Sequence, residues 1–63
     1  MTTEEALERL PAAHAAALRL DGAGAGVAAI AVALDIEPEG VAPLLEVARA
    51  KLRRVQASVV DPV

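Results

Sequence analysis

The chain has 63 residues, a net charge of −3 and no Phe, Tyr or Trp, so it lacks the stacking platforms of single-stranded nucleic-acid binders. A domain this small buries only about 60% of the surface of its unfolded chain, which leaves its stability marginal. Because it has no cysteine and a single histidine, disulfides and a self-contained metal site are excluded, and helix packing or a second chain must supply the stability.

The composition favours helices, because alanine fills about a quarter of the chain and Leu, Glu and Arg follow it. At the start, the run Thr-Thr-Glu-Glu predicts a capping box, with Thr2 as the N-cap and Glu5 three residues later. A first helix is therefore predicted from Thr3 to about Arg9.

Pro11 cannot continue the first helix, because it lacks an N–H, but it suits the first position of the next one. A second helix is predicted from Pro11 to about Leu20. Its residues expected to face the core are His14, Ala17 and Leu18. The segment DGAGAG, residues 21–26, has the glycines of a phosphate loop, but such a loop needs a preceding strand and a following Gly-Lys-Ser/Thr. Neither is present, so the segment is interpreted as a corner.

A third helix is predicted from Val27 to Leu34, followed by a tight turn at residues 35–36. Pro43 is tolerated only in a first helical turn, so the fourth helix should begin at about residue 41 or 42 and end near Gln56. The third helix is expected to bury Ile30, Ala31 and Leu34. The inward stripe of the fourth helix is Val41, Leu45, Ala48, Leu52 and Val55. A tail, residues 58–63, is expected to follow a single helical domain of residues 1–57.

Two helices joined by a short turn, the second ending in basic residues, describe a helix-turn-helix. The segments that carry a sharper likeness are ALERLP (6–11), IAVALDI (30–36) and ARAKL (48–52), with Leu18, Val41 and Leu45 between them. Together they resemble region 4 of the bacterial sigma-70 family, above all the small extracytoplasmic-function sigma factors, over roughly residues 4–55. The resemblance implies an all-α, four-helix domain of the transcription machinery that also docks on polymerase and anti-sigma proteins. LuxR-type output domains share this skeleton and stay an alternative.

The fourth helix departs from the family where the family reads DNA. In place of a polar run of the Thr-Val-Lys-Ser-Arg type, residues 40–44 are Gly-Val-Ala-Pro-Leu, and Glu46 and Val47 follow. Base edges are read mainly by Arg, Lys, Asn and Gln, and none of these occurs between Asp35 and Ala48. The acids that would approach phosphates instead are Glu37, Glu39 and Glu46. Because exposed apolar surface commonly marks a protein interface, the candidate partner-binding residues are Leu44, Val47 and Val41.

Three alternatives to the binding of a transcription protein through these residues stay open. Leu44 could pack on the first turn of its own helix, or on the tail through Val59 and Val60. The chain could also be a weak, sequence-blind DNA binder that contacts only the backbone. Its phosphate contacts would then be Arg49, Lys51, Arg53 and Arg54. Finally, it could be a helical docking domain unrelated to transcription, with the resemblance reflecting shared architecture only.

No catalytic residue, cofactor or metal site is predicted. His14 has no Cys, second His or Ser-based triad to join. The early acids, Glu4, Glu5 and Glu8, are interpreted as a solvated face at a helix N-terminus. The acidic start does not resemble a signal peptide, and no apolar run reaches the roughly 18 residues of a membrane span. We therefore expect a non-enzymatic, cytoplasmic protein that binds a sigma factor, an anti-sigma factor, RNA polymerase or a second copy of itself.

Overall fold

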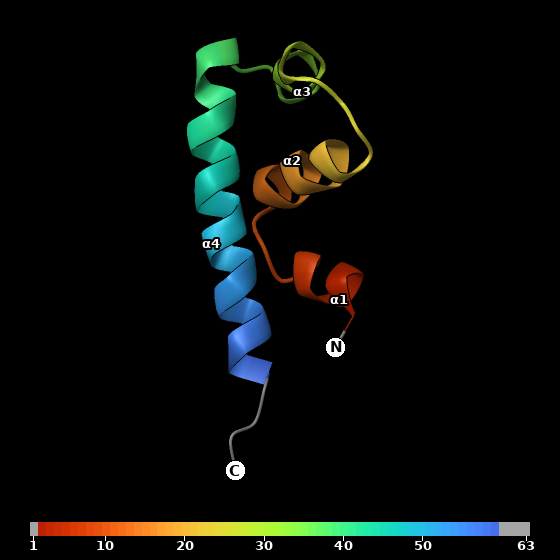
Figure 1. The fold of residues 1–63 in the computed structure, drawn as a ribbon, viewed down its shortest axis with the longest axis vertical. Coiled ribbons are helices and arrows are strands. Elements are labelled where there is room, and N and C mark those ends of the chain that lie inside the picture. The colour runs from red at the N-terminus through yellow and green to blue at the C-terminus, as the bar shows by residue number, and fades with distance from the viewer. Residues whose placement is uncertain (1, 60–63) are drawn as a thin grey trace.

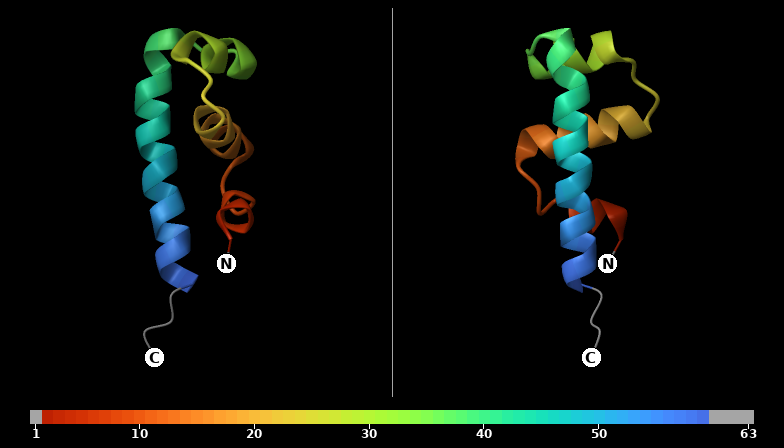
Figure 2. Two further views of the ribbon diagram at one scale, coloured as in Figure 1. Left: turned by 45° about the vertical axis from the view of Figure 1, so that its right-hand side comes forward. Right: turned by 60° about the vertical axis from the view of Figure 1, so that its left-hand side comes forward.

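The computed structural model describes residues 2–59 and, among these, the side chains of residues 2–57. Its elements are α1 (Thr3–Leu7), α2 (Ala12–Gly22), α3 (Val27–Leu34), the 3-10 turn η1 (Pro38–Gly40) and α4 (Val41–Val59). Figure 1 shows the long helix α4 running the length of the molecule, with α1, α2 and α3 stacked along one side of it. The views in Figure 2 agree, and none of the described elements covers the opposite side of α4. The protein is thus a small all-helical domain, as predicted.

The capping box at the start of α1 is confirmed. The Thr2 hydroxyl oxygen accepts a hydrogen bond from the Glu5 N–H at 3.1 Å, and Glu5 Oε1 accepts one from the Thr2 N–H at 3.3 Å. The bonds from the Thr2 backbone and side chain lower the pKa of the Glu5 carboxyl below its ordinary value of 4.5. The ionised carboxylate therefore contributes to stability at neutral pH, and this contribution is lost as the pH falls through the lowered pKa.

Replacing Thr2 by alanine should remove this cap and destabilise the chain by about 1 kcal/mol. For a domain of this size, such a loss lowers the melting temperature by about 4–8 °C, which thermal unfolding followed by circular dichroism would measure. Thr2→Ser keeps the accepting oxygen and is the matched control. A melting temperature unchanged in Thr2→Ala would contradict a role for α1 in the cooperative fold.

A residue in the left-handed conformation follows each of the helices α2 and α3. Gly24 follows α2 with φ of 89°, and Asp35 follows α3 with φ of 57° and ψ of 48°. In each case the next residue, Ala25 or Ile36, donates its N–H at 3.0 Å to the carbonyl five residues earlier. This pattern satisfies the last carbonyls of a helix and redirects the chain sharply. The predicted glycine corner and the predicted turn after residue 34 are both confirmed.

The differences from prediction lie at helix ends. Helix α1 stops at Leu7 rather than at about Arg9, because the N–H groups of Arg9 and Leu10 bond to carbonyls three residues back as the chain tightens toward Pro11. Pro11 is the N-cap of α2 rather than its first residue, and α2 continues to Gly22. Helix α4 continues to Val59, so the first two residues of the predicted tail are helical. The rest of that tail, residues 60–63, lies outside the described residues.

The core is aliphatic and consists of two clusters. The first lies among α2, α3 and α4 and contains Ala17, Ile30, Ala31, Val41 and Leu45. The second is built on Leu7, Leu10 and Ala15, with Leu18, Leu52 and Val55 packed against it. Ala48 is also fully buried. The predicted inward stripe of α4 is therefore confirmed, with its first three members buried and its last two packed on the second cluster.

Candidate functional site

Only one of the three predicted partner-binding residues lies on the surface. Val41 is fully buried in the first cluster, and Leu44 is half-buried and packs against the same cluster. The first turn of α4 lies against the core because α4 contacts α2 and α3, and η1, just before it, contacts both α3 and α4. Val41 is thus a core residue, and Leu44 packs on its own domain; the alternative contact with Val59 and Val60 falls outside the described side chains. Val47 is 47% exposed and stays available to a partner.

Helix α3 presents an apolar surface that sequence reasoning missed. Its sequence, VAAIAVAL, has no polar side chain, yet the domain covers one side of it only. The opposite side, called the α3 face below, consists of Ala28, Ala29, Val32 and Ala33, all exposed. Val32 is 81% exposed, more than any other large apolar residue in the described chain. A helix that is apolar on all sides is normally buried all round, so the α3 face has the character of an interface.

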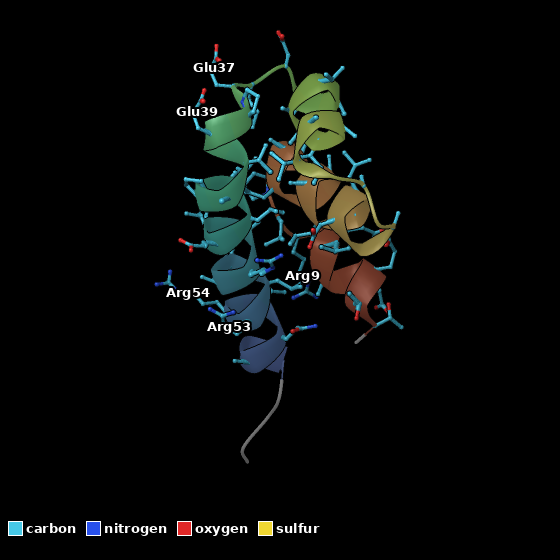
Figure 3. All side chains as sticks on the ribbon, turned by 45° about the horizontal axis from the view of Figure 1, so that its top comes forward. Arg9, Glu37, Glu39, Arg53 and Arg54 are labelled. Carbon is cyan, nitrogen blue, oxygen red and sulfur yellow. The ribbon has the colours of Figure 1, made fainter. Side chains whose placement is uncertain are left out.

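The surroundings of the α3 face are apolar at its start and acidic at its end. Val27, at the start of α3, is 52% exposed, and Ile36, just after its end, is 36% exposed. Asp35, Glu37 and Glu39 follow the helix and are exposed; we call them the acidic rim. Figure 3 shows Glu37 and Glu39 together at the end of the molecule where η1 leads into α4. A complementary surface would be apolar at its centre and basic along one edge.

The four basic residues predicted to hold phosphates are not equivalent. Arg49 Nη2 donates to Asp21 Oδ2 at 2.8 Å, in an exposed ion pair that joins α4 to the end of α2. Lys51 is half-buried, whereas Arg53 and Arg54 are exposed. In Figure 3 these two arginines lie on the side of α4 that faces away from the other helices. The charge that is free to meet an external phosphate is therefore concentrated at Arg53 and Arg54.

The two ends of the molecule differ in charge, because exposed acids and bases both lie at the end with α1, which carries Glu4, Glu5 and Glu8, whereas the end with η1 carries the acidic rim. Arg9, which sequence reasoning did not single out, is exposed and lies in the same half of the molecule as Arg53 and Arg54, because α1 packs against α4 (Figure 3). The acidic rim lies at the opposite end, beside the first turns of α4. In DNA-binding helix-turn-helix proteins these first turns meet the base edges. An acidic rim at that place repels phosphate and opposes groove binding.

The other polar side chains that the structure describes lie singly or in exposed pairs. Among residues 2–59, no three metal-ligating side chains cluster and no pocket is present. His14 is half-buried on α2, and its Nδ1 is buried without a hydrogen-bond partner. Glu4 accepts a hydrogen bond from Arg19 Nε at 2.8 Å, which links α1 to α2 and raises the pKa of Arg19. No helix in this part of the chain combines the length and apolar character that crossing a bilayer requires.

Comparison with models of protein families, with curated proteins and with solved structures gives no match to this chain. The likeness to sigma region 4 therefore depends on the sequence motifs alone. Since a small helical fold serves many functions, function has to be argued from the surfaces described above.

Proposed function

We propose that the chain is a non-enzymatic interaction module of the helix-turn-helix, sigma-region-4 type, which binds a protein of the transcription machinery through the α3 face. In this proposal α3 and α4 are the two helices of the motif. The expected partner is RNA polymerase, a sigma factor or an anti-sigma factor in the bacterial cytoplasm. The observation that carries the proposal is the 81% exposure of Val32 on a helix without a polar side chain.

The exposed side chains at the start of α4 favour a protein over a promoter. They are Ala42, Pro43, Glu46 and Val47. None of them donates a hydrogen bond, so none can make the contacts by which Arg, Lys, Asn or Gln recognise base edges. With the acidic rim beside them, this end of α4 is suited to neither bases nor phosphates, whereas the apolar α3 face next to it is suited to a protein.

Replacing Val32 by aspartate should abolish partner binding and leave the fold intact. A charge at the centre of a desolvated interface costs several kcal/mol, so capture should fall by at least about tenfold. The measurement is affinity capture from a nuclease-treated lysate of the source organism, with bound proteins identified by mass spectrometry. Ala13→Asp is the matched control, because Ala13 is exposed on α2 and the variant gains the same charge. Equal recovery of polymerase, sigma or anti-sigma proteins by Val32→Asp and wild type would contradict the proposal.

A second candidate function is weak binding to the DNA backbone, favoured by the exposure of Arg53 and Arg54 on the open side of α4. Such binding would be sequence-blind and would weaken steeply with salt. If this candidate is correct, the double variant Arg53→Glu/Arg54→Glu no longer binds duplex DNA, while Val32→Asp still binds it. Under the first proposal the same double variant still captures its protein. If both variants behave like wild type in both assays, a docking domain unrelated to transcription is favoured instead.

A further inference from the structure

A second surface lies on α4, on the side that faces away from the other helices. Five of its residues recur at alternating spacings of four and three: Pro43, Val47, Ala50, Arg54 and Ala57. We call them the α4 stripe. Alternating spacings of four and three keep residues on one line along a helix and allow a second helix to pack along it. All five are at least partly exposed, and α1, α2 and α3 leave this side open along its length (Figures 1 and 2).

The charges beside the α4 stripe are self-complementary. Glu46 immediately precedes Val47, and Arg53 immediately precedes Arg54, so the two charged residues lie on the same edge of the stripe, two helical turns apart. Both are exposed. When two identical helices pack antiparallel, residues on the same edge but at opposite ends meet. Glu46 of one copy then lies opposite Arg53 of the other, and the two-fold symmetry of a homodimer repeats the pair.

We infer that α4 packs antiparallel against α4 of a second copy of this chain, along the α4 stripe, with two symmetry-related Glu46–Arg53 ion pairs. Ala50 lies near the centre of the stripe, where a small side chain permits close approach of the two helices. Arg54 can lay its methylene groups along the interface and keep its guanidinium in water. A second copy also supplies apolar contacts to a chain that is short for a self-sufficient core.

Parallel packing of the two α4 helices would bring different charged residues together. In a parallel pair, Glu46 would lie opposite Lys51 of the other copy, and Arg53 would have no acidic counterpart.

The α4 stripe is also separate from the α3 face that the proposed function uses. Self-association and binding of a transcription partner are therefore independent, and each can fail without the other.

The test is sedimentation equilibrium of the full chain up to millimolar concentration, with interference optics because the chain has no aromatic side chain. Wild type is expected to show a monomer–dimer equilibrium. Glu46→Arg and Arg53→Glu should each weaken the dimer by about tenfold, because each replaces two attractive contacts by two repulsive ones. The double variant Glu46→Arg/Arg53→Glu restores opposite charges and should return to within about twofold of wild type.

Lys51→Glu is the matched control, since it makes the same charge change as Arg53→Glu two residues away and should leave the dimer unchanged. A monomer at every concentration would overturn the inference. The inference would also be overturned if Lys51→Glu weakened the dimer and Arg53→Glu did not, which is the pattern expected of a parallel pair. A double variant whose dimer is no stronger than the dimers of the single variants would overturn it as well. Circular dichroism checks that each variant is folded. Val32→Asp should dimerise like wild type, and loss of its dimer would overturn the placement of the contact on α4.

Discussion

Replacing Ile30 by alanine is expected to remove most of the stability of the chain. Ile30 is 1% exposed and lies in the cluster among α2, α3 and α4. Deleting its buried carbons should cost about 2–5 kcal/mol. At about 0.05–0.15 kcal/mol per residue, a chain of 63 residues has only about 3–9 kcal/mol in total. Urea unfolding followed by circular dichroism would measure the free energy of unfolding of the variant.

Val32→Ala is the matched control for this prediction, because Val32 lies two residues further along the same helix and is 81% exposed. Its free energy of unfolding should stay within about 0.5 kcal/mol of wild type. The contrast between the two variants defines which side of α3 is covered. Equal losses in both would contradict the orientation of α3 and with it the α3 face.

Replacing Val41 by aspartate is expected to leave the chain largely unfolded at neutral pH. Val41 is fully buried among aliphatic side chains, and an unpaired charge in such a place costs about 3–5 kcal/mol. Burial would raise the pKa of the new carboxyl in the folded state, so folding would favour its protonated form. Relative to wild type at the same pH, the variant should therefore regain stability as the pH falls toward about 4, where an exposed Asp also becomes protonated. Circular dichroism across this pH range would measure the recovery.

Val47→Asp, made on the same helix at a residue that is 47% exposed, is the control. In dilute solution, where the chain is monomeric, its stability should stay within about 1 kcal/mol of wild type. The two variants therefore distinguish Val41 from Val47, which were both predicted from the sequence to bind a partner. If Val41→Asp unfolded at the same urea concentration as wild type, Val41 would belong to the surface and the description of the core would be wrong.

The features of the fold that were predicted from the sequence depend on interactions within a few residues. Local hydrogen bonding or ring geometry accounts for four of these features: the capping box at Thr2, the break at Pro11, the glycine corner, and the start of α4 at Val41, which places Pro43 in its first turn. For this reason all four helices lie where they were expected. Their ends differ by a few residues, because the last turn of a helix also depends on what it packs against.

The site could be predicted only in part, because it depends on which side of each helix is covered. The predicted buried side of α3 is confirmed, since Ile30 and Ala31 are buried and Leu34 packs against their cluster. Every side of VAAIAVAL is apolar, however, so its spacing does not show that the domain leaves the side with Val32 uncovered. Leu44 shows the reverse case, since its partial burial depends on how the start of α4 packs against the first cluster. The pairing of Arg49 with Asp21 likewise depends on how α4 crosses α2. None of these relations is local in sequence.

The most direct test of the proposed interface is nuclear magnetic resonance mapping of the nitrogen-15-labelled chain as the captured partner is added. We expect the perturbed backbone amides to lie between residues 27 and 36, in α3 and the adjoining end of the acidic rim. Added duplex DNA should not displace the partner. Perturbations confined to residues 49–54 and reversed by duplex DNA would contradict an interface on α3 and would establish the basic end of α4 as the binding site.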